Sequence, residues 1–326
     1  MRLINVHTLD LEDFWGKDPP AYAILSHTWG TEEVSFQDWK ARTSISHKAG
    51  FDKIIKVAQI AEKLDLNYVW VDTNCIDKTS SAELSEAINS MFAWYSKAEW
   101  CLVHLDDVPS IDDPTLRGRS AGYTLEALQH SRWFTRGWTL QELIAPACLA
   151  FFSQNWQIIG YLRKVSRRGK EWTDETIAHW FHTPINDIQI IEEKIVDTIS
   201  HITGIARATL VTKEDYVNES IAVRMHWASK RRTTRVEDMA YCLFGLFNIN
   251  MPLLYGEGKA AFQRLQEEIM KVSIDQSIFA WSSESLDLEH SWPRGRALST
   301  TNTLSKPKLH PEPRSTLFIP WKITDY

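Results

Sequence analysis

The first residues able to do chemistry follow a short apolar run, 22–25 (YAIL). They bring two hydroxyls, an imidazole, an indole and a flexible turn residue: Ser26, Thr28, His27, Trp29 and Gly30. Four largely apolar residues ahead of a turn are typical of a buried strand. The pattern predicts that the three polar side chains line a cleft beyond the strand, while the indole and the glycine shape the turn that closes it. In the structural alternative, the indole fills the core.

Two further groups of this kind lie downstream. One starts at Asp72, directly after the apolar run 68–71 (YVWV). The other is RGWTLQEL, which carries a guanidinium, an indole and a carboxylate: Arg136, Trp138 and Glu142. A carboxylate can stabilise positive charge, an indole can stack on a flat ring and a guanidinium can hold a phosphate. Each has a plain structural alternative, namely a solvated helix residue, a core residue and an ion-pair partner.

The elements that must position these groups alternate between strand and helix. Apolar runs predict strands at 22–25, 68–72, 100–105 and 148–153, with helices at 50–66 and 81–97 and shorter ones at 123–134 and 137–146. Alternation of this kind favours a parallel sheet with helices on both faces. Because open parallel sheets bind ligands at the carboxyl ends of their strands, the residues after 25 and after 71 are expected to meet at one cleft.

The sequence pattern changes after about residue 170, where apolar residues recur mainly at helical spacing. Thr234 and Glu237 have the spacing of a capping box ahead of an apolar helix, as do Ser80 and Glu83 earlier in the chain. We expect an α/β domain over 1–160, a mostly helical region over 161–282 and a linker or loosely packed tail over 283–326.

Composition excludes several classes of protein. The 326 residues carry a net charge of −6, which argues against a nucleic-acid surface. The four Cys show no C-x-x-C spacing, so neither a zinc site nor a disulfide framework is expected, and no metal ligands are predicted. The N-terminus lacks the apolar core of a secretory signal, and no apolar run is long enough to span a membrane. A cytoplasmic protein with no nucleic-acid or membrane partner is the expectation.

Three motifs, taken together and in order, resemble a known family. They read LSHTWG (25–30), WVDTNCID (70–77) and RGWTLQE (136–142), and they are similar to the marks of the fungal heterokaryon incompatibility (HET) domain. The likeness covers roughly 20–150 and continues to about 275 through the segment that starts RRTTRVED. Two positions depart from the family pattern, which commonly has Tyr at His27 and Gln at Lys78.

The resemblance implies a role in nonself recognition and regulated cell death between incompatible fungal partners. HET domains also look like distant relatives of TIR domains, which have a flavodoxin-like parallel sheet. Many TIR domains cleave NAD at the nicotinamide–ribose bond with a Glu in a W/C-x-x-E-L pattern, and WTLQEL would put Glu142 in that place. NAD then enters as substrate with no required cofactor, and the expected partners are further copies of the chain and an incompatibility protein.

Two other functions remain open from the residues alone. The alternative is a non-enzymatic module that self-associates and recruits death effectors, and such a scaffold should tolerate Glu142→Gln. A Cys–His nucleophile built from Cys75, His27 and Asp72 is a further arrangement, set against the alternative that Cys75 is buried and inert.

Overall fold

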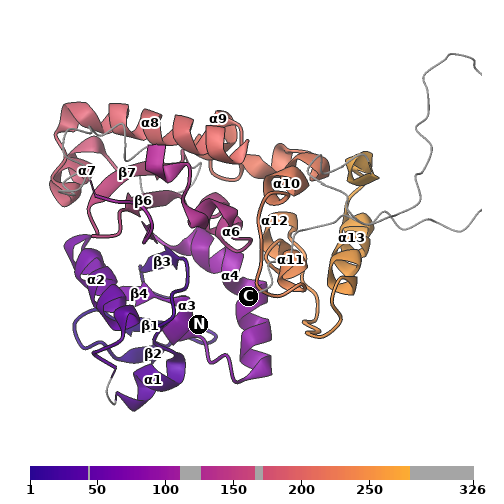
Figure 1. Ribbon diagram of the computed structural model, residues 1–326, viewed down its shortest axis with the longest axis horizontal. Coiled ribbons are helices and arrows are strands. Elements are labelled where there is room, and N and C mark those ends of the chain that lie inside the picture. The colour runs from indigo at the N-terminus through magenta and orange to yellow at the C-terminus, as the bar shows by residue number, and fades with distance from the viewer. Residues whose placement is uncertain (43–44, 111–125, 166–171, 280–326) are drawn as a thin grey trace, which may run out of the picture.

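The computed structural model describes residues 1–42, 45–110, 126–165 and 172–279. A seven-stranded sheet in the order β2-β1-β4-β3-β5-β6-β7 forms its centre (Figure 1). The strands are β1 (Arg2–Asn5), β2 (Leu11–Asp13), β3 (Ala23–His27), β4 (Tyr68–Trp70), β5 (Trp100–His104), β6 (Cys148–Phe152) and β7 (Ile158–Arg163). The expected α/β class, with a sheet flanked by helices and followed by a helical region, is confirmed, and the sheet is mixed rather than wholly parallel.

The sheet is parallel only at its centre. Strands β4, β3, β5 and β6 run parallel, whereas β1, β2 and β7 pair antiparallel at the two edges. The edge strands were not predicted from the sequence. The connections 6–10 and 153–157 are too short for a parallel crossover, which needs a dozen residues or more, so each must close a hairpin.

Helices cover the sheet and then form a separate layer. Those up to residue 144 are α1 (Phe36–Ala41), α2 (Ala49–Lys63), α3 (Asp72–Cys75), α4 (Ser81–Lys97), the 3₁₀ turn η2 (Arg132–Thr135) and α6 (Thr139–Ile144). The later ones are α7 (Asp174–Phe181), α8 (Ile185–Thr203), α9 (Arg207–Val211), α10 (Ile221–Ala228), α11 (Asp238–Tyr241), α12 (Phe244–Phe247) and α13 (Ala260–Val272), with 3₁₀ turns η3 (Asp215–Asn218) and η4 (Gln276–Phe279). Helix α8 packs on β7, and α12 packs on α4 (Figure 1).

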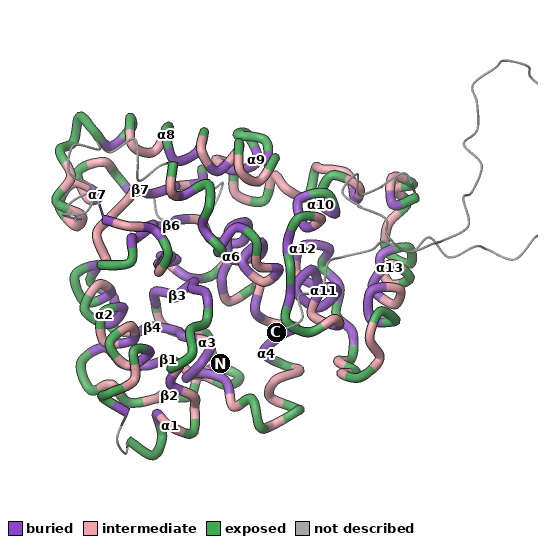
Figure 2. The backbone as a smooth tube through the Cα atoms, viewed as in Figure 1, coloured by how far each residue is buried: buried purple, intermediate pink, exposed green. Residues whose placement is uncertain are grey.

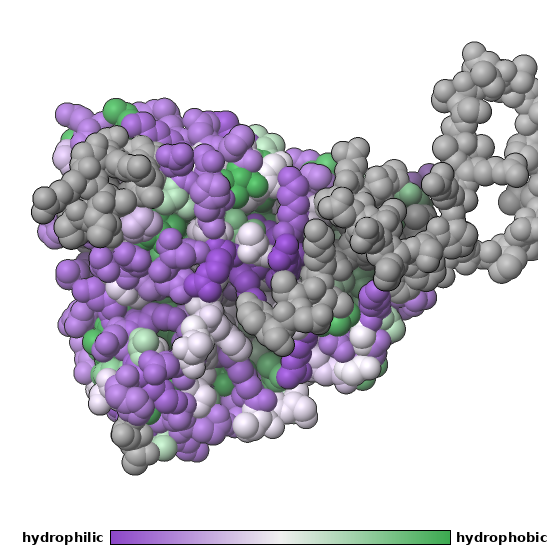
Figure 3. All heavy atoms as spheres, in the orientation of Figure 1, coloured by the Kyte–Doolittle hydropathy of each residue, from purple (hydrophilic) through white to green (hydrophobic). Residues whose placement is uncertain are grey.

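The core lies between the sheet and these helices. Strands β3, β5 and β6 are buried along their whole length, and so is every residue of α6. Figure 2 shows this burial in purple at β3 and β6. Trp70 has no exposed surface and belongs to this core. The described part of the face in Figure 3 is mostly hydrophilic, with hydrophobic residues in small separate patches. No helix among the described residues has the length and apolar character needed to cross a bilayer.

The predicted capping boxes form only in part. The Ser80 hydroxyl accepts from the Glu83 backbone N–H at 3.4 Å, but the Glu83 carboxylate accepts from the Asp77 N–H and from Arg2 instead. The prediction at Thr234 and Glu237 is wrong, because α11 begins only at Asp238. The Glu237 carboxylate accepts the backbone N–H groups of Gly256 and Gly258, and thereby anchors a loop rather than a helix start.

Two other expectations concern segments that lie partly or wholly outside the described residues. Of the helix predicted over 123–134, residues 123–125 lie outside them, and the remainder is a single turn at 126–128 followed by η2. The predicted tail, 283–326, also lies outside them. Strand β7 crosses residue 160, and the domain boundary proposed there stays a prediction.

Candidate ligand cleft

A cleft of about 340 Å³ opens where β3 and β4 end. Its other wall comes from the segment that leads into α6 and from the helical region around α11. The residues predicted from the sequence that line it are His27, Trp29, Asp72, Arg136, Trp138 and Glu142. The cleft therefore gathers side chains from all three motifs at the carboxyl ends of parallel strands, as open sheets of this kind do.

The three other predicted site residues face protein groups. Ser26 lies behind Glu142 and is fully buried. The Thr28 hydroxyl donates to the Asp106 carboxylate at 3.0 Å. The Gly30 N–H donates to the Glu33 carboxylate at 2.8 Å.

Glu142 is a buried carboxylate on a buried helix. Its side chain is 7% exposed, so the alternative of a solvated helix residue is wrong. The Ser26 hydroxyl donates to Glu142 Oε2, and Ser26 Oγ in turn accepts from Trp133 Nε1 at 2.7 Å. Burial raises the pKa of Glu142 to about 8; the Asp72 charge adds to the rise, while the Ser26 bond, Tyr95 and Arg231 oppose it. The buried environment therefore favours the protonated form of Glu142.

Two buried cations hold α6 at its ends. Arg231 Nη1 donates to the Arg136 carbonyl at 3.1 Å and to the Thr139 hydroxyl at 2.9 Å. Lys164 Nζ donates to the last carbonyls of the helix, those of Leu143 and Ile144, at 2.7 and 2.6 Å. These carbonyls have no partner within the helix, and a cation suits the helix C-terminus. Neither cation was predicted from the sequence, where each is one basic residue among several.

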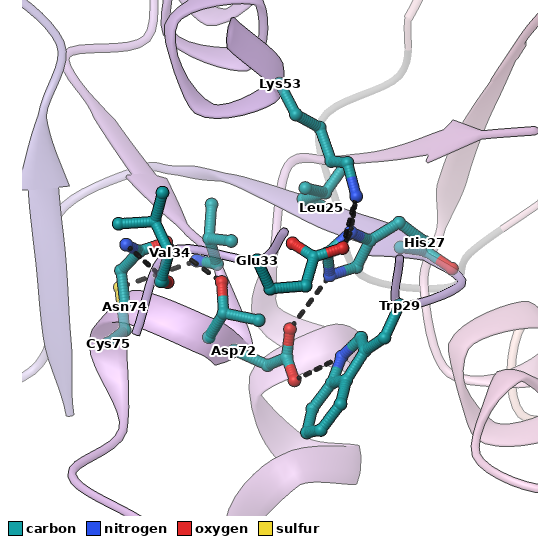
Figure 4. A network of polar contacts seen from close by, with 12 residues as sticks. Leu25, His27, Trp29, Glu33, Val34, Lys53, Asp72, Asn74 and Cys75 are labelled. Carbon is teal, nitrogen blue, oxygen red and sulfur yellow. Dashed lines mark hydrogen bonds and ion pairs between the residues drawn. The ribbon is translucent and has the colours of Figure 1, made fainter. Parts of the chain in front are cut away.

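Asp72 lies at the centre of a polar network (Figure 4). Trp29 Nε1 donates to Asp72 Oδ2 at 3.0 Å, and Lys78 Nζ donates to the same oxygen at 3.2 Å. Lys53 Nζ lies 2.9 Å from His27 Nδ1, and an ammonium can only donate, so Nδ1 accepts. The neutral ring then carries its proton on Nε2, which donates to Asp72 Oδ1 at 3.0 Å.

This network keeps Asp72 ionised. Burial by itself would raise the pKa of Asp72, but the Lys78 charge and the His27 hydrogen bond lower it well below the usual range. Trp29 is 52% exposed, so the alternative in which this indole fills the core is wrong. The Lys78 ammonium lies 3.8 Å from the centroid of the Trp29 ring, which is a cation–π contact.

Basic and aromatic side chains line the outer part of the cleft. Arg136 Nη2 donates to the Thr234 hydroxyl at 3.2 Å, and the Arg235 guanidinium lies over the Tyr255 ring, 4.5 Å from its centroid. Among the described residues, neither arginine pairs with a carboxylate. Sequence reasoning missed Arg235 and Tyr255, because nothing in their spacing ties them to motifs a hundred residues earlier.

Trp138 is half-buried and is held from across the cleft. Its Nε1 donates to Asp238 Oδ2 at 3.3 Å, and the Tyr255 hydroxyl donates to Asp238 Oδ1 at 2.9 Å. Burial raises the pKa of Asp238, although both hydrogen bonds oppose the rise. The helical region thus supplies a third acidic side chain to the cleft, after Asp72 and Glu142, and fixes one of its indoles.

The Cys–His nucleophile does not form. Cys75 is buried, its sulfur accepts from the Val71 N–H at 3.4 Å, and burial raises the pKa of the thiol to about 12. Both nitrogens of His27 are bonded elsewhere. The interpretation of Cys75 as buried and inert therefore holds. Within the described ranges, no three or more His, Cys, Asp and Glu side chains are grouped so as to hold a metal ion.

Comparison with known proteins bears on this geometry. Residues 22–121 match the family model described as "Heterokaryon incompatibility protein (HET)". This chain carries a HET domain. A second family model, "Domain of unknown function (DUF8212)", matches residues 260–320, and no solved structure matches significantly.

A curated relative extends the likeness beyond the HET domain. "Vegetative incompatibility protein HET-E-1" of Podospora anserina is 42% identical over 259 residues, which is 78% of this chain. The chain spans only 16% of the length of that relative. Of the cleft side chains described above, His27, Trp29, Asp72 and Lys78 lie within the HET match, whereas Glu142 and the lining residues from Arg136 to Tyr255 lie beyond residue 121.

Proposed function

We propose that this chain acts in heterokaryon incompatibility as a nonself-recognition and cell-death effector, and that its cleft binds NAD and cleaves the nicotinamide–ribose bond. The HET domain and the printed name of the relative support the first part. The second part rests on one observation about the cleft. A buried carboxylate, Glu142, lies without a basic ion-pair partner among the described residues, while Lys78, Arg136 and Arg235 line the outer part.

This distribution of charge fits a ligand with a cationic ring and an anionic tail. NAD in its oxidised form carries a positive nicotinamide ring and a pyrophosphate. The ring would face Glu142 between the indoles of Trp29 and Trp138, while the pyrophosphate would lie against the outer cations. A cleft of about 340 Å³ lies in the range of small-molecule sites and would hold part of a dinucleotide.

The proposed chemistry needs a carboxylate and a water molecule. As the bond between the ring nitrogen and the ribose C1′ breaks, its electron pair neutralises the ring, and positive charge develops on the ribose. An ionised Glu142 would stabilise that charge. Water then adds to C1′ and loses a proton, which yields ADP-ribose and neutral nicotinamide. Because the leaving group is neutral, no general acid is required.

The test is nicotinamide release from NAD by the purified chain at high concentration, with and without a fused tag that forces self-association. We expect release by the wild type and a loss of about 100-fold or more in Glu142→Gln, the scale of removing one electrostatic group from a site. Glu193→Gln, on the exposed face of α8, is the matched control and should keep full activity.

No release under either condition would overturn the enzymatic proposal. A non-enzymatic module that self-associates and recruits death effectors would then be the better account. In that case Glu142→Gln should leave incompatibility signalling intact.

A further inference from the structure

The two acidic side chains that reach the inner cleft differ in their partners. Asp72 accepts three donors, from His27, Trp29 and Lys78. Glu142 accepts the Ser26 hydroxyl, and no Lys, Arg or His among the described residues lies within ion-pair distance of it. One carboxylate is therefore neutralised by the protein, whereas the other is buried with no such compensation.

The groups that face Glu142 from each packed element explain its state. Ser26 approaches from β3, Tyr95 from α4 and Asp72 from α3. Cys101 on β5 donates its thiol to the Glu142 backbone carbonyl at 3.8 Å, which leaves the carboxylate unaffected. The remaining group, Arg231, acts on Glu142 through its charge alone: its Nη1 donates to the Arg136 carbonyl and the Thr139 hydroxyl, and neither a hydrogen bond nor an ion pair joins it to the carboxylate among the described residues. Burial and the nearby Asp72 charge favour the protonated form of Glu142, and they outweigh the opposing effects of the Ser26 and Tyr95 hydroxyls and of the Arg231 charge.

We propose that the cleft takes its ligand as a cation, and that the ligand's positive charge displaces the proton of Glu142 as the ligand binds. One proton would leave to solvent for each cation bound, so the inner cleft stays neutral. In the empty cleft Glu142 would stay protonated, so no unpaired carboxylate would be buried. In the occupied cleft Glu142 would be ionised, with its charge beside a cationic ring. The inference rests on the proposed function in one respect: it takes the cationic part of the ligand to be a nicotinamide ring.

The proposal predicts linkage between affinity and pH. The pKa of Glu142 in the empty cleft is about 8. Below that pH, a cation must displace the proton before it can bind, so its Kd should rise by up to about tenfold for each pH unit lost. Above it, the affinity should level off. A neutral ligand of the same shape should show no such dependence.

The probes are 1-methylnicotinamide, which is a cation, and nicotinamide, which is neutral and nearly the same shape. Binding is followed by tryptophan fluorescence from about pH 6 to pH 9, and proton release by calorimetry in buffers of different ionisation enthalpy. We expect tighter binding of the cation, with its Kd falling as pH rises and with a proton released near pH 7. Equal affinity for the two probes, or a flat pH profile for the cation, would overturn the proposal.

Two variants assign the proton. Glu142→Gln should abolish both the pH dependence and the preference for the cation. Asp238 is the other cleft carboxyl whose pKa is raised, so Asp238→Asn is the matched control. It should keep the pH dependence, whatever it does to the affinity itself. If the cation's Kd lost its pH dependence in Asp238→Asn but kept it in Glu142→Gln, the assignment of the proton to Glu142 would be overturned. The pH profile of the wild type remains a test of the proposal even if one variant fails to fold.

This test separates the inference from the proposed function. 1-Methylnicotinamide has no ribose and cannot be cleaved, so its binding does not depend on hydrolysis. Proton-coupled binding without nicotinamide release from NAD would refute the enzymatic proposal alone. Release from NAD with no discrimination between the two probes would refute the inference alone.

Discussion

The Ser26 hydroxyl, at the end of β3, donates a hydrogen bond to the Glu142 carboxylate on α6. The two residues are 116 positions apart in the chain, and the bond joins the first sequence motif to the third. Trp133 Nε1 donates to the same hydroxyl at 2.7 Å and so directs its proton toward Glu142. The orientation of the carboxyl in the cleft is thereby set by the strand end, and its burial makes it titrate far from its ordinary range.

The titration of Glu142 should be visible in stability. Its pKa is about 8 in the folded state against an ordinary 4.5, so between these values the folded state binds more protons than the unfolded state. The free energy of unfolding should therefore fall as pH rises through this window, by at most about 1.4 kcal/mol per unit. Urea denaturation at about pH 5 and pH 7.5 should show the fall in the wild type and a smaller one in Glu142→Gln. Equal slopes would contradict the assignment.

Lys164 should produce the opposite trend at higher pH. Burial lowers the pKa of its ammonium to about 7 from an ordinary 10.5, so in that window the unfolded state binds more protons. The free energy of unfolding should rise with pH from about 7 to 10.5, again by at most about 1.4 kcal/mol per unit. Lys164→Met should lack this rise, and Lys271→Met, an exposed lysine on α13, should keep it. A rise of equal size in Lys164→Met would count against the buried ammonium.

Asp72→Asn should release Trp29. The amide is neutral, so the ion pair with Lys78 is lost, and it cannot accept at both positions as the carboxylate does. We expect a loss of about 1–3 kcal/mol in the free energy of unfolding and a shift of the Trp29 indole N–H signal in ¹⁵N-resolved NMR spectra. Asp13→Asn is the matched control, since Asp13 accepts from the Trp15 indole at 2.9 Å. It should move the Trp15 signal only; an unmoved Trp29 signal in Asp72→Asn would refute the contact.

Gly137→Ala should strain the junction between α6 and the helical region. A Cβ there would lie 2.5 Å from Thr233 Cγ2 and 3.2 Å from Cys242 Sγ, so close approach, rather than a turn conformation, requires the glycine. We expect a loss of about 1–3 kcal/mol in thermal or urea unfolding. Thr233→Ser removes the offending methyl and keeps the hydroxyl that donates to the Arg235 carbonyl at 2.6 Å. In the double variant part of the loss should be regained; full additivity of the two changes would argue against the clash.

The local sequence pattern was sufficient to predict the central strands of the sheet and the residues that follow their carboxyl ends in the cleft. Continuous apolar runs at β3, β4, β5 and β6 identify strands buried on both faces, and the polar residues that follow mark their carboxyl ends. That is why the sequence alone places His27 and Asp72 near each other. The edge strands β1, β2 and β7 were missed, because short, partly exposed segments carry little periodicity.

The environment of each side chain was decided only by the tertiary structure. A Glu in WTLQEL reads the same on an exposed helix and on a buried one; it is buried here because α4, β3 and the segment after α10 close around α6. The same packing brings Arg235 and Tyr255 to the cleft and leaves Trp29 half outside it. Residue types and strand ends are local properties of the chain, whereas burial, protonation and the second wall of the cleft arise from contacts between segments far apart in it.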